Sequence, residues 1–266
     1  MVDPKIDPMQ INFRMQRTRW RLWALFVCAC ILSPVCMKAQ SAARAAKAAA
    51  PIDLTGYWVA VVTQDWLQRM VTPAKGDYAS IPITAAAKQV GDAWDPQKDE
   101  AAHEECRSYG APGLMRSPTR LHITWNDDNT LRVETDYGMQ TRLFHFGNWK
   151  AAGGPATWQG DSVVRWEVAP GQGGPSDGVP NTGSLKVVTS HLRPGYLRKN
   201  GVPYSGDAML TEYWDLFKAT SDEQWIEITS IVEDPLYLRQ PWVTALHFKK
   251  EPSGNKWDPT PCSAVW

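Results

Sequence analysis

The stretch Arg120–Phe146, RLHITWNDDNTLRVETDYGMQTRLFHF, decides the fold, because it holds three strand patterns separated by two turns. Apolar or aromatic residues alternate with polar ones, and clusters of turn-forming residues interrupt the alternation twice. Such short connections predict strands that pair antiparallel with their neighbours. The expected strands are 120–125, 130–136 and 140–146.

The register of these strands follows from matching their apolar residues. With a three-residue loop at 126–128, Leu121 faces Val133, and His122 faces Arg132. A second loop at 137–139 then places Glu134 opposite Arg142. One face is aliphatic, and the other is polar and aromatic, which predicts that the second face lines a cavity. The polar and aromatic face carries Arg120, His122, Arg132, Glu134, Arg142, Phe144 and Phe146.

Six further segments have the composition of strands, which makes about nine in all. We therefore expect a mostly β fold, an antiparallel lipocalin-like barrel with one or two short helices, and a β-sandwich as the alternative. Helices are expected at 85–94, where Thr84 is a suitable N-cap, and at 99–108. The further strands are 54–63, 162–168, 185–192, 210–216, 225–232 and 243–249.

The N-terminal region has the features of a secretory signal. Residues 1–50 hold eight Lys or Arg and two acids, and the apolar run Leu22–Val35 is shorter than the roughly 20 residues of a membrane span. We expect a signal peptide at 1–40, an Ala-rich linker at 41–52 and one domain at 53–266, in a periplasmic or secreted protein. An uncleaved signal anchor is the alternative.

Removing the signal changes the charge. The chain has 28 basic and 28 acidic residues, so 51–266 keeps 20 basic and 26 acidic residues. A mildly acidic domain has no overall electrostatic reason to bind nucleic acid or an anionic membrane surface. We expect no nucleic-acid partner and no stable membrane span after cleavage.

Only two of the five cysteines, Cys106 and Cys262, lie outside the predicted signal. In an oxidising compartment such a pair predicts one disulfide, and two free buried thiols are the alternative. The sequence has no CxxC or Cys/His metal spacing, no P-loop, no GxGxxG after a strand, no GxSxG and no HExxH. We therefore expect neither a metal nor a cofactor.

Residues 54–58, LTGYW, resemble the G-x-W opening of lipocalin-like and other calycin barrels, in which the Trp packs across the barrel base. More of the chain resembles secreted bacterial proteins of uncharacterised function. That resemblance implies a β-barrel-like fold and no particular activity. It rests on DLTG at 53–56, Cys106 with GLM at 113–115, Arg142, TWQGDS at 157–162, WE at 166–167, and DPLY with PW at 234–242.

Twelve Trp lie after the signal, which favours an aromatic pocket for a hydrophobic or ring-bearing ligand over ordinary core packing. For proton transfer the candidates are His122, Glu212 and His191. Residues expected to bind the ligand are Arg132, Arg142, Glu134, Phe144, Trp214, Tyr213 and Trp125.

These features predict an exported protein that performs cofactor-free acid–base chemistry on a small hydrophobic or aromatic molecule, as a lyase, isomerase, hydratase or cyclase. A non-catalytic periplasmic carrier with the same cavity is the main alternative. A structural envelope protein, in which the Trp serve only the core, is a third.

Overall fold

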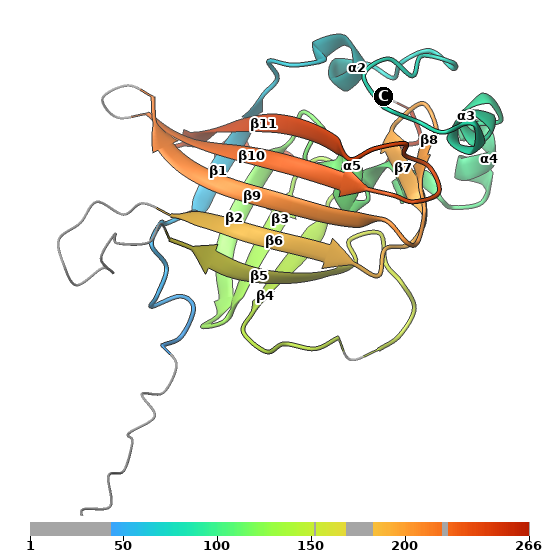
Figure 1. Ribbon diagram of the computed structural model, residues 1–266. Coiled ribbons are helices and arrows are strands. Elements are labelled where there is room, and N and C mark those ends of the chain that lie inside the picture. Colours follow the sequence, from blue (N-terminus) through green and yellow to red (C-terminus); the bar gives the residue numbers. More distant parts are fainter. Residues whose placement is uncertain (1–43, 152, 169–182, 220–222, 266) are drawn as a thin grey trace, which may run out of the picture. The chain divides into compact units, whose positions relative to one another are not determined.

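A computed structural model of the chain describes residues 44–151, 153–168, 183–219 and 223–265. Nine strands close into a barrel in the order β1-β11-β10-β9-β6-β5-β4-β3-β2 (Figure 1). Neighbouring strands pair antiparallel except β4 and β5, which are parallel. The barrel strands are β1 (Gly56–Val61), β2 (Arg120–Asp127), β3 (Thr130–Thr135), β4 (Thr141–Phe146), β5 (Asp161–Glu167), β6 (Ser184–Ser190), β9 (Met209–Lys218), β10 (Gln224–Glu233) and β11 (Trp242–Glu251).

All nine expected strands form, and the closed sheet excludes the β-sandwich alternative. The helix expected at 85–94 is confirmed as α3, and its N-cap Thr84 accepts a hydrogen bond from the Ala87 N–H. The segment expected as one helix at 99–108 divides into two short helices, and two further helices and a small hairpin were not predicted. These elements are α2 (Trp66–Met70), α3 (Ala85–Asp92), α4 (Pro96–Ala101), the 3₁₀ helix η1 (Glu105–Tyr109), α5 (Ala111–Leu114), and the hairpin of β7 (Gly195–Arg198) and β8 (Val202–Tyr204).

The register of the first hairpin differs from the predicted one by two residues. His122 faces Glu134, not Arg132, because β2 continues to Asp127 and the turn lies at 128–129, while a bulge after Trp125 limits the shift to two residues. A shift of two residues preserves the faces of both strands. Leu121 and Val133 therefore remain in the core, as predicted.

The second hairpin differs by one residue, and this changes the faces. Thr141, not Arg142, faces Glu134, because the loop has four residues, 136–139, not three. A slip of one residue turns every side chain of a strand to the other face. Arg142, Phe144 and Phe146 are therefore buried, and Leu143 is exposed. The predicted polar and aromatic face does not exist as one surface.

The two ends of the barrel have different coverings. The long connection from β1 to β2 and the β7–β8 hairpin gather at one end (Figure 1). We call α2, α3, α4, η1, α5, β7 and β8 the capping layer. Its apolar side chains form a second hydrophobic cluster together with residues of the barrel strands, and Val202 and Tyr204 of β8 and Leu210 of β9 are fully buried in it.

The N-terminal segment is partly packed on the barrel. The predicted signal peptide, residues 1–40, lies outside the described residues. Of the expected linker, residues 44–52 are described, and the Ala46 carbonyl accepts a hydrogen bond from Trp166 Nε1 at 3.0 Å. Ala46 and Ile52 are buried in the barrel core. In the part of the chain that the structure describes, no helix is long and apolar enough to cross a membrane.

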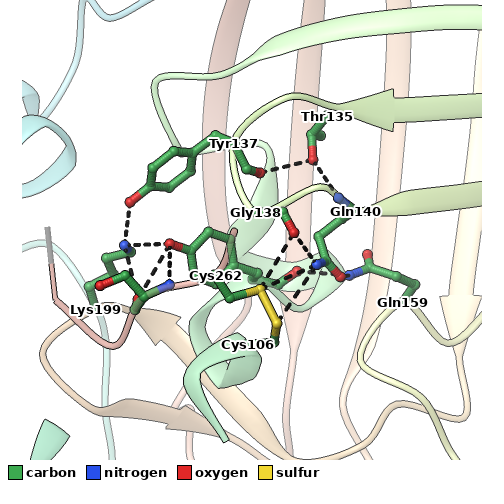
Figure 2. Close-up of a disulfide and its surroundings, with 10 residues drawn as sticks. Cys106, Thr135, Tyr137, Gly138, Gln140, Gln159, Lys199 and Cys262 are labelled. Atoms are coloured by element: carbon green, nitrogen blue, oxygen red, sulfur yellow. Dashed lines mark hydrogen bonds between the residues drawn. A yellow bond between two sulfur atoms is a disulfide. The ribbon is translucent and has the colours of Figure 1, made fainter. Parts of the chain in front are cut away.

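Two sequence-based expectations about the core are met. Trp58, from the G-x-W opening, is fully buried, and its Nε1 donates to the Leu54 carbonyl at 2.9 Å. Cys106 and Cys262 form a disulfide that joins η1 to the C-terminal tail (Figure 2).

Candidate functional site

The three residues expected to transfer protons occupy separate environments. His122 stacks on Tyr57 with ring centroids 4.3 Å apart, and its Nδ1 lies 3.3 Å from Glu134 Oε2. His191 follows β6 with an exposed side chain, and its Nδ1 lies 2.9 Å from Asp161 Oδ2. Glu212 is buried inside the barrel. The described contacts do not unite the three in one site.

Glu212 forms a double hydrogen bond with Arg142 inside the barrel. Arg142 Nη2 donates to Glu212 Oε2 at 2.6 Å and to Thr189 Oγ1 at 3.2 Å, and Nη1 donates to Glu212 Oε1 at 3.0 Å. The Arg142 guanidinium also lies 4.8 Å from the Phe144 ring centroid. The guanidinium and the carboxylate are bonded to each other, so the ion pair forms part of the packed interior of the barrel.

The other residues expected to bind a ligand are also divided. Trp214 is fully buried, with its ring centroid 5.5 Å from that of Phe144. Trp125 packs on Phe146 with centroids 5.7 Å apart. Arg132 Nη2 donates to Glu134 Oε1 at 2.7 Å, and Lys186 Nζ lies 5.0 Å from the Tyr213 ring centroid.

A cluster of buried positive charge lies in the capping layer. Three arginines from three separate segments converge there: Arg69 in α2, Arg116 after α5, and Arg198 in β7. Their relative exposures are 3 %, 7 % and 5 %. Arginine is rarely buried so deeply without compensating charge or hydrogen bonds. We call the space between them the arginine pocket, which is lined by Arg69, Arg116, Arg198, Lys199, Ser108 and Ser117 among others.

Two carboxylates compensate part of this charge. Arg116 Nη2 donates to Asp65 Oδ2 at 3.0 Å, and Arg198 Nη1 lies 4.0 Å from Asp77 Oδ1. Arg198 also donates from Nη2 to the Ala79 carbonyl at 2.8 Å. Among the described contacts, three guanidinium groups therefore meet two carboxylates.

Arg69 has the least compensated guanidinium. Its Nε donates to the Arg116 carbonyl at 2.7 Å, but its buried Nη2 has no hydrogen-bond partner among the described residues. The Arg198 Nε is also buried and has no hydrogen-bond partner among the described residues. Buried N–H groups of this kind normally have partners, so these two are available to an anion.

The pKa values of the arginines reflect the crowding. Burial and the nearby Arg116 lower the pKa of Arg69 to about 10, with Asp65 acting against the shift. Burial and Arg116 also lower the pKa of Arg198 to about 10, against the effect of Asp77 and Asp65. All three remain cations near neutral pH, and a bound anion would relieve their repulsion.

The pocket is small. It offers about 30 Å³ to the centres of water-sized molecules, which is room for about two waters. A carboxylate, phosphate or sulfate group fits this space, and a large organic ligand does not. Any larger ligand must place only its anionic group there.

Lys199 joins the pocket to a cluster around the disulfide. Its Nζ donates to Tyr109 Oη at 2.8 Å, to the Ser263 carbonyl at 3.3 Å, and to the hydroxyl of Tyr137 (Figure 2). Burial lowers the pKa of Lys199 to about 7. An amine with this pKa exchanges protons near neutral pH.

The disulfide fixes the tail that completes this cluster. Cys262 precedes Ser263, and Gln140 Nε2 lies 3.4 Å from Cys262 Sγ and 2.5 Å from the Gly138 carbonyl (Figure 2). Gln159 Nε2 donates to Gln140 Oε1 at 2.9 Å and to the Tyr109 carbonyl at 2.8 Å. These bonds hold Tyr109 and the tail in place next to Lys199.

A second cavity lies at the opposite end of the barrel from the capping layer. It offers about 510 Å³ to water-sized molecules, which is within the range of small-ligand sites. Its lining is mixed, with apolar and charged side chains together. These residues are Ile52, Asp53, Leu216, Phe217, Lys218, Gln224 and Lys250.

Comparison with known proteins gives no name for either site. No protein-family model, no curated protein and no solved structure matches the chain. In the described ranges, His, Cys, Asp and Glu side chains form no group of three or more that is suited to a metal ion.

The arginine pocket was not predicted from the sequence. A signal for it exists, because each arginine lies within an apolar or aromatic run: WLQRM at 66–70, LMR at 114–116 and YLR at 196–198. A charged residue in such a run either points its side chain to solvent, unlike its apolar neighbours, or is buried with them and has a function. Pattern alone does not decide between these, because the three runs meet only in the folded chain.

Proposed function

We propose that this protein binds a small anionic molecule, whose anionic group is held in the arginine pocket. The observation that carries the proposal is the buried Arg69 guanidinium, whose Nη2 has no described partner. A buried cation without full compensation destabilises a fold, so its presence favours a ligand that supplies the missing negative charge. We further propose, from the sequence, that the domain is exported and is of the lipocalin-like type.

The chemistry of the ligand group follows from the donors. Guanidinium groups present paired N–H donors that match the oxygens of carboxylate, phosphate and sulfate. Ser108 and Ser117 add hydroxyls to the lining. Three guanidinium groups meet two carboxylates in the pocket, which leaves one positive charge in excess, and a single negative charge on the ligand balances it.

The test is thermal unfolding with increasing phosphate, sulfate or acetate, at ionic strength held constant with chloride. Binding to the folded state raises the unfolding temperature in proportion to the logarithm of ligand concentration above the Kd. We expect this increase for wild type and its loss for Arg69→Gln. Arg165→Gln is the matched control, because Arg165 is an exposed arginine paired with Glu167. Equal stabilisation of wild type and Arg69→Gln would refute the proposal.

Proton-transfer chemistry on the bound anion is a second candidate, favoured by the position of Lys199. Lys199 lines the arginine pocket, and its pKa is lowered to about 7 by burial. It would replace His122, Glu212 and His191 as the proton-transfer group of the cofactor-free enzyme expected from the sequence. Incubation with small carboxylic acids in deuterium oxide, followed by mass spectrometry, tests for proton exchange. Exchange that survives in Lys199→Met would exclude Lys199 as the base.

The hydrophobic or aromatic ligand expected from the sequence remains a proposal for the second cavity. Leu216 and Phe217 supply apolar surface there, and Lys218 and Lys250 supply charge. A fluorescent apolar probe displaced by such a ligand tests it, with Phe217→Ala expected to weaken binding.

A further inference from the structure

The helix that supplies Arg69, α2, buries its charged side chain and exposes its apolar ones. In α2 and the residue after it, Trp66, Leu67, Met70 and Val71 are between 47 % and 60 % exposed, and Arg69 is buried. A surface helix normally buries its apolar residues and exposes its charged ones. Here the charged residue points into the arginine pocket, and the apolar residues are left at the surface.

The local bonding fixes this orientation. Asp65 stands at the N-cap position but makes no side-chain capping bond, and its carboxylate accepts from Arg116. Arg69 Nε donates to the Arg116 carbonyl at 2.7 Å. Both ends of α2 are therefore tied to Arg116, which turns the apolar residues outward.

Contiguous exposed apolar residues usually mark a surface that another molecule covers. We call Trp66, Leu67, Met70 and Val71 the apolar patch. It adjoins the pocket, since α2 contributes Gln68 and Arg69 to the pocket lining and Trp66, Leu67 and Met70 to the patch.

We propose that the apolar patch and the arginine pocket together bind an anionic lipid at a membrane surface, with the lipid phosphate in the pocket and the patch in the interfacial region of the bilayer. This rests on the proposed function, because it names the source of the anion that the pocket holds. The pocket has room for a small anionic group only, so the remainder of the ligand lies outside it, and α2 places exposed apolar residues next to the pocket-lining Gln68 and Arg69. A phospholipid in a bilayer presents an anionic group and apolar chains in this proximity.

The side chains of the patch suit an interface. Trp is enriched where an apolar phase meets water, because its ring is apolar and its Nε1–H is a donor. The net negative charge of the domain argued against an anionic membrane. The local charge of the pocket reverses that argument, because binding depends on the charge at the contact, not on the total.

The experiment is co-sedimentation of the protein with two kinds of vesicle, phosphatidylcholine alone and phosphatidylcholine mixed with phosphatidylglycerol. We expect binding to the mixed vesicles, and binding at least about tenfold weaker for Trp66→Ser/Leu67→Ser. The matched control is Val163→Ser, since Val163 is also an exposed apolar residue, in β5. Phosphate-dependent stabilisation should be unchanged in Trp66→Ser/Leu67→Ser, which shows that this variant is folded and keeps its pocket.

Each other outcome has a definite meaning. Phosphate binding without vesicle binding overturns the lipid proposal and leaves the anion-binding function standing. Absence of phosphate binding overturns the anion-binding function itself. Equal binding to both kinds of vesicle overturns the role of the pocket. Equal binding by wild type and Trp66→Ser/Leu67→Ser overturns the role of the patch. A dimer in sedimentation velocity that Trp66→Ser/Leu67→Ser dissociates assigns the patch to a second copy of the chain and overturns the lipid.

Discussion

Arg142 and Glu212 form an ion pair across the barrel interior, and each side chain is only 1 % exposed. The pair links β4 to β9, which are not neighbours in the sheet. Removing one partner of a buried pair leaves an uncompensated charge in a dry environment, whereas removing both does not. Single and double substitutions of Arg142 and Glu212 can therefore measure how strongly the two side chains are coupled.

We expect Arg142→Met to lower the free energy of unfolding by about 3–5 kcal/mol, because Glu212 is then left buried without its partner. The double variant Arg142→Met/Glu212→Leu should be less destabilised than Arg142→Met alone. Urea unfolding of both single variants and the double variant measures the coupling.

The control for this cycle is the exposed pair of Arg165 and Glu167. Arg165 Nη2 lies 2.6 Å from Glu167 Oε1, but both side chains are substantially exposed. Arg165→Gln should change stability by less than about 1 kcal/mol. Additive effects in the Arg142 and Glu212 cycle would contradict the coupling.

The disulfide gives a second prediction. Cys106 and Cys262 are separated by 156 positions, and closing a loop of this length contributes about 5 kcal/mol in the chain-entropy model. Cys106→Ser/Cys262→Ser should therefore unfold at lower urea concentration than wild type. It should also lose protection of the backbone around Ser263 in hydrogen exchange, because the tail is no longer tied beside Tyr109.

Reduction of wild type is the corresponding control. Wild type treated with dithiothreitol should approach the stability of Cys106→Ser/Cys262→Ser, and the variant should not respond to the reductant. A variant as stable as oxidised wild type would show that packing of the tail alone holds it in place.

A third prediction concerns Gly138, in the loop between β3 and β4. Its φ is +77°, and a Cβ there would lie 2.1 Å from Tyr109 Cδ1. Gly138→Ala therefore meets both backbone strain, about 1–2 kcal/mol, and a clash with a ring that hydrogen bonds hold in place. Gly76→Ala is the matched control, because Gly76 has a φ of +89° and nothing within 4 Å of its Cβ position.

The difference between these two variants isolates the clash. We expect Gly138→Ala to be the more destabilised by about 1–3 kcal/mol, as is usual for overpacking. Thermal unfolding measures it. Equal losses in the two variants would mean that Tyr109 moves aside without cost.

Structural features that depend on neighbouring residues can be predicted from the sequence of this protein, and features that depend on contacts between distant residues cannot. The nine barrel strands and Thr84 at the N-cap of α3 follow from local patterns, which period and turn chemistry set. The face of Arg142 does not, because it depends on whether one loop has three residues or four. The arginine pocket cannot be predicted from local patterns either, because Arg69, Arg116 and Arg198 meet only through the packing of the capping layer.

The buried amine of Lys199 gives a prediction about pH. Burial lowers its pKa to about 7 in the folded protein, whereas a lysine in the unfolded chain has a pKa of about 10.4. Between these values the unfolded state binds more protons than the folded state, so the free energy of unfolding rises with pH. We expect wild type to gain stability from pH 7 to about pH 9, and Lys199→Met to lose this part of the dependence.

The upper limit of that window is set by the two tyrosines that face the amine. Burial raises the pKa of Tyr109 and of Tyr137 in the folded protein. Tyrosines of the unfolded chain lose protons at about pH 10, so above that value these two side chains lower stability as pH rises and oppose the effect of Lys199. Urea unfolding should therefore be compared below about pH 9, with Lys98→Met as the control, because the Lys98 side chain is 82 % exposed. Lys98→Met should keep the slope of wild type. The same slope in Lys199→Met would assign the pH dependence to another group, and the amine would then lack the proton exchange that the catalytic alternative requires.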